Sequence, residues 1–425
     1  MDDFKFETLA LHAGHTVDND TLSRGVPIYR TSSYLFRDTE HAANLFGLKE
    51  MGNIYTRLMN PTQDVLEKRV AALEGGVAAL ALASGTSAIF YTIINICKQG
   101  DEVVAANNLY GGTYTQFDTI LPQLGVTVRL VDPSDPANFA AAVNERTRAI
   151  YCETIGNPGL DMTDLEAVSK VAKKHHLPLI IDSTFTPPCL QRPLEHGADI
   201  VLHSLTKWMG GHGVAVGGIV VDGGTFDWTD SRFTLYNEPD PSYHGLRYGH
   251  DLGELSPMAF ALRMRLVALR NLGACISPDN AWCFLQGLET LALRMERHCA
   301  NAQAVADYLN GHDQVEWVRY PGLEENGPAR RYLKNGFGGM VACGLKSGRA
   351  GGQKFIEALR LFSHLANVGD AKSLAIHPAT TTHSQLSKEQ LEDAGLSESM
   401  IRLSVGIENI DDILADLDQA LSACA

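Results

Sequence analysis

Short apolar segments alternate with helical segments between residues 77 and 221, and this alternation constrains the fold more than any other feature of the sequence. The segments are apolar along most of their length, which predicts strands that are buried on both faces. Their alternation with helices predicts an α/β fold with a mainly parallel sheet between two layers of helices. The predicted strands are AALALAS (78–84), EVVAAN (102–107), VTVRLVD (126–132), AIYCET (149–154), LPLIID (177–182), ADIVLHS (198–204) and GGIVVD (217–222).

The flanking segments have other patterns and predict separate parts of the molecule. Residues 1–60 show no sustained period, which predicts an extended N-terminal arm. A helical pattern starts next, and we predict a large domain over residues 61–285. Within it, residues 222–258 are rich in Gly, Pro, Asp and Tyr and predict a long surface loop. Residues 286–425 predict a smaller C-terminal α/β domain.

Composition and charge exclude several classes of protein. Lys and Arg number 35 against 50 Asp and Glu, so the net charge is −15 and binding to nucleic acid or an anionic membrane is disfavoured. The eight cysteines form no CxxC pair, and His377 and His383 lie six positions apart, so we expect no metal site. The N-terminus lacks a signal-peptide pattern, and no apolar run approaches about 20 residues, which predicts a cytoplasmic protein.

The strongest chemical signal follows two neighbouring predicted strands. Asp182 ends LPLIID, and Ser204, Thr206 and Lys207 follow the next strand in HSLTKW. Ligands bind beyond the carboxyl ends of the strands in an open parallel sheet, so an acid, two hydroxyls and an amine are expected around one crevice. A desolvated lysine has a lowered pKa and can form a Schiff base. A helix-capping Asp182 and a surface Lys207 are the alternative interpretation of the same spacing.

A second signal is ASGTSA (83–88), where a predicted strand leads directly into an apolar helix. The backbone N–H groups of Gly85 and Thr86 at the start of that helix favour an anion, and phosphate is the natural occupant. An ordinary N-cap produces the same pattern, so this segment alone leaves both interpretations open. The sequence has no GxxxxGK[ST] motif, which excludes a nucleoside triphosphate site of that type.

Three further residues stand at strand ends or in a strand. Tyr110 in NLYGGTY can stack on a flat ligand or simply pack, and Asn157 in ETIGNP can bind a ligand or form a plain turn. Arg402 lies in the otherwise apolar strand MIRLSVG and therefore needs a carboxylate partner, which belongs either to a substrate or to the protein itself.

Eight motifs together resemble the pyridoxal-phosphate enzymes of cysteine and methionine metabolism, the family of cystathionine synthases and lyases, methionine γ-lyase and O-acetylhomoserine sulfhydrylase. They occur in the family's order and span nearly the whole chain. The resemblance implies fold type I, with a mainly parallel seven-stranded sheet in the large domain. The motifs are YTRLMNPT (55–62), ASGTSA (83–88), NLYGGTY (108–114), ETIGNP (153–158), IDSTF (181–185), HSLTKWMGGHG (203–213), ANVGDAKSLAIHPATTTH (366–383) and RLSVGIE (402–408).

The resemblance also implies pyridoxal 5′-phosphate as the cofactor and suggests which residues hold it. Lys207 would bind it covalently, and Asp182 would pair with the pyridine nitrogen, which makes the ring an electron sink. Tyr110 would stack on the ring and Asn157 would bond its phenolic oxygen. The implied phosphate ligands are the backbone of Gly85 and Thr86 and the hydroxyls of Ser204 and Thr206.

The resemblance implies further roles in binding and catalysis. Tyr55 and Arg57 are similar to residues that reach the phosphate of a neighbouring subunit, which implies a homotetramer of two catalytic dimers. Arg402, with Asn367 nearby, would bind the substrate α-carboxylate. Tyr110 or Tyr55 would shuttle protons, and Tyr55 would also contact the substrate.

Within the family, the YTRLMNPT variant, the 222–258 segment and the overall length resemble the O-acetylhomoserine sulfhydrylases, and Gly112 stands where methionine γ-lyases carry a reactive cysteine. This implies a transferase of methionine biosynthesis, in which sulfide or methanethiol replaces the acetate of O-acetyl-L-homoserine to give homocysteine or methionine. Methionine γ-lyase, cystathionine γ-lyase and cystathionine γ-synthase are alternatives, and so is O-succinylhomoserine as the donor. A dinucleotide-dependent oxidoreductase is the alternative from another class, although no GxGxxG follows a strand.

Overall fold

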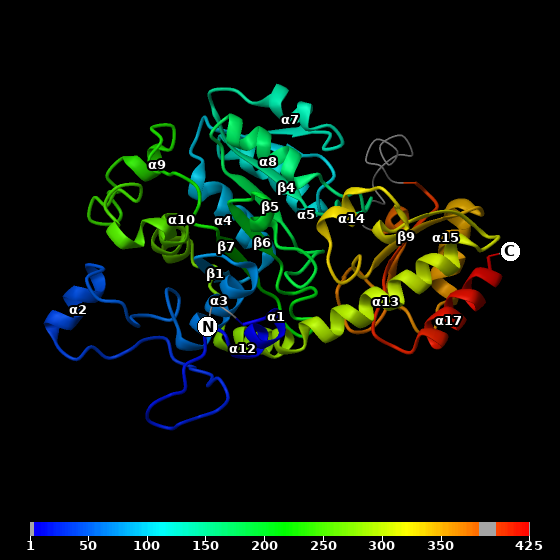
Figure 1. Ribbon diagram of the computed structural model, residues 1–425, viewed down its shortest axis with the longest axis horizontal. Coiled ribbons are helices and arrows are strands. Elements are labelled where there is room, and N and C mark those ends of the chain that lie inside the picture. The colour runs from blue at the N-terminus through cyan, green and yellow to red at the C-terminus, as the bar shows by residue number, and fades with distance from the viewer. Residues whose placement is uncertain (1–3, 382–396, 425) are drawn as a thin grey trace.

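A seven-stranded sheet forms the centre of the larger part of the molecule. The computed structural model describes residues 4–381 and 397–424 (Figure 1). The sheet has the order β1-β7-β6-β5-β4-β2-β3, and only β7 runs antiparallel to its neighbours. This confirms the predicted α/β class with a mainly parallel sheet. The strands are β1 (Ala78–Leu82), β2 (Glu102–Ala106), β3 (Thr127–Val131), β4 (Thr147–Glu153), β5 (Leu179–Asp182), β6 (Ile200–His203) and β7 (Gly218–Asp222).

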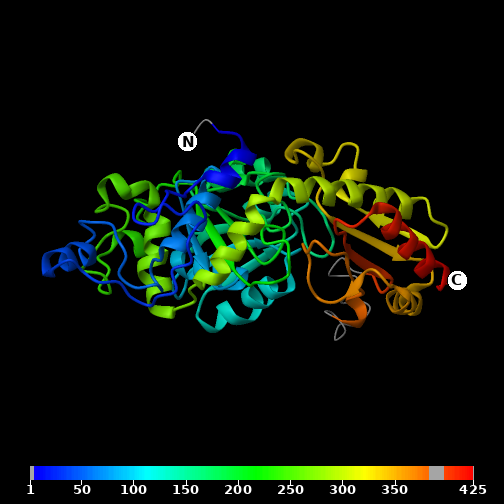
Figure 2. The ribbon, with the colours of Figure 1, turned by 90° about the horizontal axis from the view of Figure 1, so that it is seen from below.

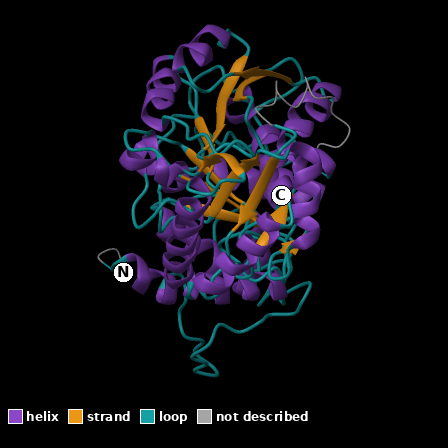
Figure 3. Cartoon of the chain, turned by 90° about the vertical axis from the view of Figure 1, so that its right-hand side faces the viewer, coloured by secondary structure: helices purple, strands orange, loops and turns teal. Residues whose placement is uncertain are grey.

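Helices from the segments between these strands cover the sheet on both sides (Figure 3). Helices α3 (Pro61–Glu74) and α4 (Gly85–Ile96) pack against β1 and β7, and α8 (Leu165–Lys174) packs against β5. The Asn60 side chain caps the start of α3, and Gly75 ends it in a left-handed conformation with φ of 80°. The other helices of this part are α5 (Gly111–Thr115), α6 (Leu121–Gln123), α7 (Pro136–Ala142), α9 (Thr234–Asn237), α10 (Ala259–Arg263), α11 (Arg270–Leu272) and α12 (Pro278–Glu289).

A second sheet of five strands lies in the C-terminal part of the chain. Its order is β10-β11-β12-β9-β8, and all neighbours except β10 and β11 are antiparallel. Figures 1 and 2 show it beside the first sheet, with α13 (Leu291–Asn310) running from one part to the other. The other elements here are β8 (Val315–Arg319), α14 (Pro328–Tyr332), β9 (Met340–Leu345), α15 (Gly348–Ala358), β10 (Ser363–His364), β11 (Leu374–Ile376), β12 (Met400–Ser404) and α17 (Ile410–Ser422).

Helix α13 is anchored in both parts. Near its start, the buried Arg294 guanidinium donates hydrogen bonds to the carbonyl oxygens of Trp208 at 2.8 Å and Met209 at 3.2 Å. One turn further, the His298 ring bonds through Nδ1 to the carbonyl of Val405 at 2.7 Å, just after β12. The helix therefore joins the backbone next to Lys207 to the end of a strand in the second sheet.

The buried apolar side chains form two clusters. The larger surrounds the seven-stranded sheet, and the smaller fills the space between the second sheet and the helices α13, α15 and α17. The predicted domain boundaries, at residues 60/61 and 285/286, stay predictions. None of the helices in residues 4–381 and 397–424 combines the length and the apolar character that a membrane crossing needs.

Two segments differ from their predicted form. The arm contains two helices, α1 (Phe6–His12), which packs on α3, and α2 (Thr39–Phe46). The segment 222–258, predicted as a long surface loop, is instead ordered around buried aromatic rings. Trp228 stacks on Tyr236 with ring centroids 4.2 Å apart, and Tyr236 is fully buried. The aromatic residues bury surface that stabilises one conformation of this segment, although its Gly and Pro content predicted only turns.

Candidate active site

The carboxyl ends of three parallel strands form one edge of the seven-stranded sheet, and acidic side chains end two of them. Glu153 is the last residue of β4, Asp182 is the last of β5, and the two are register partners. Asp182 is also paired in register with Leu202 of β6, after which the chain continues to Lys207. The sheet therefore brings Asp182 and the Lys207 segment to one edge.

Lys207 holds its amine against a side-chain amide. Its Nζ donates a hydrogen bond to Oδ1 of Asn367 at 2.5 Å. Burial, with a smaller effect from the Arg402 charge, lowers the pKa of Lys207 to about 8. More of this amine is therefore neutral, and nucleophilic, than in an exposed lysine. Gly369 permits the close packing, because a Cβ there would lie 3.1 Å from Lys207 Cα and φ is +77°.

Asp182 is buried among neutral hydrogen-bonding groups. Its carboxylate accepts a hydrogen bond from the Thr184 backbone N–H at 2.9 Å and one from the Tyr151 hydroxyl at 3.5 Å. Burial raises the pKa of Asp182, and these hydrogen bonds oppose the rise. A cationic group placed against this carboxylate would favour its ionised form, so the position suits a protonated ring nitrogen.

The start of α4 meets the loop after β6. Ser84 caps the helix by accepting a hydrogen bond from the Ser87 N–H at 3.0 Å, and the first N–H groups of a helix have no partner inside it. Gly85 lies so close to Ser204 that a Cβ there would be 2.8 Å from the Ser204 Cβ. The helix start, with Gly85 and Thr86, and the Ser204 hydroxyl thus line one space suited to an anion.

Thr206 is engaged with the backbone near the start of β7. Its hydroxyl accepts a hydrogen bond from the Gly217 N–H at 3.1 Å and lies 3.2 Å from the Gly217 carbonyl, to which it donates. An additional anion would therefore compete with the Gly217 carbonyl for the single hydroxyl proton of Thr206.

Tyr110 is half exposed, and a buried carboxylate fixes its backbone. The Tyr110 N–H donates to Oε1 of Glu153 at 2.7 Å. Burial, together with the neighbouring Asp182, raises the pKa of Glu153 well above its usual range. Gly112 packs against the ring, because a Cβ there would be 2.5 Å from Cε1 of Tyr110. A larger residue at Gly112 would require the ring to move.

Arg402 reaches from the second sheet to the edge of the first. It lies in β12, and its Nη1 donates a hydrogen bond to Oδ1 of Asn157 at 2.7 Å. Burial lowers the pKa of Arg402 to about 10, and the nearby Tyr110 partly offsets this. No protein carboxylate bonds to this guanidinium among the residues that the structure describes. The alternative of an internal Asp or Glu partner therefore has no support.

Tyr55 and Arg57 contact each other. Tyr55 is 41 % exposed, and the Arg57 guanidinium carbon lies 5.2 Å from its ring centroid. The Arg57 Nε is buried and has no hydrogen-bond partner among the described residues. In the described part of the chain, no hydrogen bond or ion pair joins either residue to Lys207, Asp182 or Arg402.

Sequence reasoning missed several groups that support the site. Glu153 belongs to the motif ETIGNP. Its hydrogen bond to Tyr110, however, forms because β2 and β4 are neighbours in the sheet. Thr184 bonds to Asp182 through its N–H and accepts the Ser204 N–H through its hydroxyl at 2.9 Å. Ser404 holds the Gly369 N–H at 2.9 Å. No group of three or more His, Cys, Asp or Glu suited to a metal ion occurs in residues 4–381 and 397–424.

Comparison with known proteins gives consistent matches along the chain. Residues 7–422 match the family model described as Cys/Met metabolism PLP-dependent enzyme. An O-acetyl-L-homoserine sulfhydrylase of Leptospira meyeri is 57 % identical over 98 % of this chain and 97 % of its own. A homocysteine synthase of Schizosaccharomyces pombe is 51 % identical over 98 % of both chains.

A solved structure is also similar. It is an O-acetylhomoserine (thiol)-lyase of Campylobacter jejuni with N′-pyridoxyl-lysine-5′-monophosphate, and its sequence is 41 % identical to this chain. The superposition has a TM-score of 0.94 and covers 99 % of this chain and 100 % of the other. This likeness extends over both sheets.

Proposed function

The chain belongs to the Cys/Met metabolism PLP-dependent enzymes, and we propose that it replaces the acetate of O-acetyl-L-homoserine by sulfide, giving homocysteine and acetate. The supporting observation is a buried lysine of lowered pKa, Lys207, in a chain that matches O-acetylhomoserine sulfhydrylases over almost its whole length. The family membership favours this class over a dinucleotide-dependent oxidoreductase.

The residues at the sheet edge fit pyridoxal 5′-phosphate, whose aldehyde and electron-accepting ring supply the covalent chemistry when bound. The Lys207 amine would attach it, and the buried Asp182 carboxylate would pair with the pyridine nitrogen. Tyr110 would stack on the ring, and Asn157 would bond the phenolic oxygen. Gly85, Thr86, Ser204 and Thr206 would hold the phosphate.

Arg402 and Asn367 bind the amino-acid substrate. Among the described residues, the Arg402 guanidinium bonds to the neutral Asn157 amide and to no carboxylate, so an α-carboxylate can serve as its charged partner. Asn367 already holds the Lys207 amine, which places the base of the reaction beside the carboxylate site. Once free, Lys207 Nζ takes the substrate α proton, and Tyr110 or Tyr55 moves protons at the leaving group.

Tyr55 and Arg57 act on the site of a neighbouring subunit, within a homotetramer built from two catalytic dimers. Their support is the exposed Tyr55 ring and the buried Arg57 Nε, which has no hydrogen-bond partner in residues 4–381 and 397–424. A neighbouring phosphate would satisfy that buried donor.

Sulfide is favoured over methanethiol, because the relatives include homocysteine synthases. A γ-lyase is disfavoured at Gly112, where a cysteine side chain would collide with the Tyr110 ring. The deciding experiment incubates the yellow holoenzyme with O-acetyl-L-homoserine, with and without sulfide, and measures homocysteine and keto acid. Homocysteine formed only with sulfide supports the proposal, and keto acid released without any thiol contradicts it. O-Succinylhomoserine, tested in parallel, determines the donor preference.

A further inference from the structure

Two buried carboxyl side chains lie next to each other at the edge of the seven-stranded sheet. Glu153 of β4 and Asp182 of β5 are register partners in parallel strands, so their side chains project from the same face of the sheet. Neighbouring strands lie about 4.8 Å apart, which brings the two carboxyl groups close together. Glu153 is 6 % exposed and Asp182 is 8 % exposed. The proposed reaction uses Asp182 but not Glu153.

No basic side chain bonds to either carboxyl group within residues 4–381 and 397–424. His203, the last residue of β6, bonds to Glu74 at 2.5 Å instead. The cationic groups of Lys207 and Arg402 bond to neutral side-chain amides. Two carboxylates that share a buried site without a cation repel each other, so one of the two takes up a proton.

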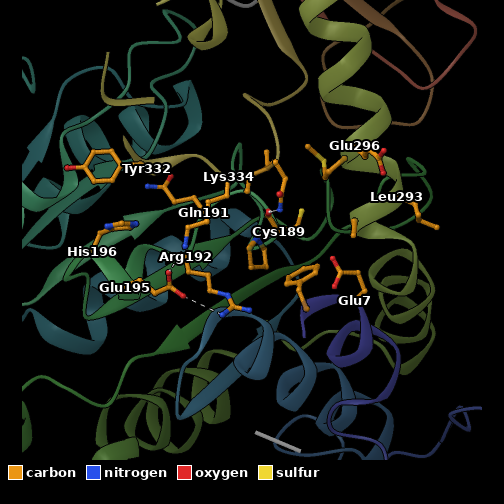
Figure 4. A pocket seen from close by; sticks show the side chains of 16 residues that line it. Glu7, Cys189, Gln191, Arg192, Glu195, His196, Leu293, Glu296, Tyr332 and Lys334 are labelled. Carbon is orange, nitrogen blue, oxygen red and sulfur yellow. Dashed lines mark hydrogen bonds and ion pairs between the residues drawn. The ribbon is translucent and has the colours of Figure 1, made fainter. Parts of the chain in front are cut away.

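A carboxylate beside α13 shows the opposite arrangement (Figure 4). Glu195 lies 3.4 Å from the Arg192 guanidinium and 3.2 Å from the Lys334 amine. Burial acts to raise the pKa of Glu195, but these two basic groups outweigh it and the pKa is lowered. At Glu153 burial acts without a basic partner, and with the added effect of Asp182 it raises the pKa of Glu153 well above the usual range.

The hydrogen-bond donors around the two carboxyl groups decide which one keeps the negative charge. Asp182 accepts hydrogen bonds from the Thr184 N–H at 2.9 Å and from the Tyr151 hydroxyl at 3.5 Å. Glu153 accepts one, from the Tyr110 N–H to Oε1 at 2.7 Å. Donors favour the ionised form, and a protonated ring nitrogen at Asp182 would favour it further. The proton therefore belongs on Oε2 of Glu153, because Oε1 serves as the acceptor.

We propose that Glu153 is a positioning residue that works as a neutral carboxylic acid, fixing the backbone of Tyr110 without adding a second negative charge beside Asp182. This inference rests on the proposed function, in which Tyr110 stacks on the cofactor ring and Asp182 pairs with its nitrogen. A second ionised carboxyl group here would hold protons more tightly on the nearby nitrogen atoms, including the Lys207 amine, whose neutral form is the nucleophile.

Infrared difference spectra between the holoenzyme and its Glu153→Gln variant, recorded at neutral pH, test the charge of Glu153. The substitution keeps an acceptor for the Tyr110 N–H and removes the acid. We expect the variant to lose the C=O stretching band of a protonated carboxyl group and to keep all carboxylate bands. Glu145→Gln, at an exposed glutamate, is the control and should lose carboxylate bands instead. Loss of carboxylate bands in Glu153→Gln would overturn the proposal.

Spectrophotometric titration of the same two holoenzymes gives an independent measurement. A neutral Glu153 contributes no charge, so we expect the visible absorption to change at the same pH in Glu153→Gln and in the unmodified protein. A midpoint lowered by about one pH unit would show that a negative charge had been removed, and would contradict the proposal. Neither measurement requires turnover. A protein that binds pyridoxal phosphate but forms no homocysteine would therefore refute the proposed reaction and leave this inference standing.

A further variant tests whether Glu153 acts through Tyr110. Glu153→Leu is also neutral but removes the acceptor of the Tyr110 N–H, so we expect kcat to fall about tenfold, in line with the loss of one hydrogen bond. Glu153→Gln, which keeps the acceptor, should lose much less. In a Tyr110→Ala background, Glu153→Leu should cause no further fall in kcat. An equal fall in both backgrounds would show that Glu153 serves only the fold.

Discussion

Two groups of candidate site residues, those at the strand ends and those on the N-terminal arm, differ in whether their polar atoms find hydrogen-bond partners in the same chain. At the sheet edge, the Lys207 amine, the Asp182 carboxylate and the Arg402 guanidinium all have hydrogen-bond partners in the same chain. On the arm, Tyr55 is exposed and the Arg57 Nε has no hydrogen-bond partner in the part of the chain that the structure describes. The comparison teaches that the fold of a single chain positions the lysine, the aspartate and the arginine, whereas the described residues offer no such partner to the Arg57 Nε of the arm.

Removing the Lys207 amine, at the strand ends, should have the largest effect. In Lys207→Ala we expect no covalent attachment of pyridoxal phosphate, and none of the visible absorption that borohydride removes from the unmodified protein. We also expect a loss of turnover of more than about 10³-fold, because the nucleophile and the base are lost together. Absorption spectra and homocysteine formation measure both effects. Lys170→Ala, which changes an exposed lysine on α8, is the control and should behave like the unmodified protein.

Substituting Arg402, the arginine at the strand ends, should chiefly affect substrate binding. Arg402→Ala removes a charge-assisted contact worth about 1.5–3 kcal/mol, so we expect KM for O-acetyl-L-homoserine to rise roughly 10- to 150-fold. Steady-state kinetics determine this value. Arg349→Ala, at an exposed arginine of α15, should leave KM unaltered. A normal KM in Arg402→Ala would place the carboxylate elsewhere.

The proposed role of the arm residue Arg57 in a neighbouring subunit can be tested by mixing variant subunits. We expect Arg57→Ala to lower kcat/KM about tenfold through the loss of one phosphate contact. Arg37→Ala, at an exposed arm arginine paired with Glu50, is the matched control. Mixing Lys207→Ala and Arg57→Ala subunits should regain activity, because hybrids then contain one site free of both defects. No gain on mixing would mean that Arg57 serves its own chain.

The pH dependence of cofactor uptake should show the smallest effect. Burial lowers the pKa of Lys207 to about 8, so the reactive neutral amine increases as the pH rises through that value. We expect the rate of covalent uptake by cofactor-free protein to rise about threefold from about pH 7.5 to 8.5 and then to level off. Stopped-flow absorbance follows this reaction. A rate that still rises above about pH 10 would indicate an exposed lysine instead.

The sheet and the residues that follow its strands could be predicted from the sequence. Apolar strands are a local signal, and ligands bind beyond the carboxyl ends of parallel strands whatever the rest of the sequence is. Asp182 and Lys207 follow strands that are easily recognised. Arg402 was noticeable as a charge in an apolar strand. The partner of that charge, Asn157, lies 245 positions away in the chain and could not be inferred from spacing.

Other features depend on packing that no periodicity reveals. The aromatic cluster around Trp228 forms from a segment whose glycines and prolines predict turns. Helix α1 is short, and its burial of Leu9 and Ala10 depends on α3. The hydrogen bond of Glu153 to Tyr110 requires knowledge of which strands are neighbours. Sequence patterns thus predict which residues follow a strand, but not which side chains contact one another.

The anchoring of α13 has a mechanical consequence. A rod of 20 residues, about 30 Å long, is fixed at one end to the Trp208 carbonyl through Arg294, next to the lysine. If the C-terminal part tilts about this fixed end, the displacement is small at Lys207 and grows along the rod toward β8 and β9. Arg402 lies only three positions before Val405, whose carbonyl bonds to His298 one turn from that fixed end. A tilt would therefore leave Arg402 and Lys207 nearly in place relative to each other and would move chiefly the parts of the second sheet that pack on the far end of α13.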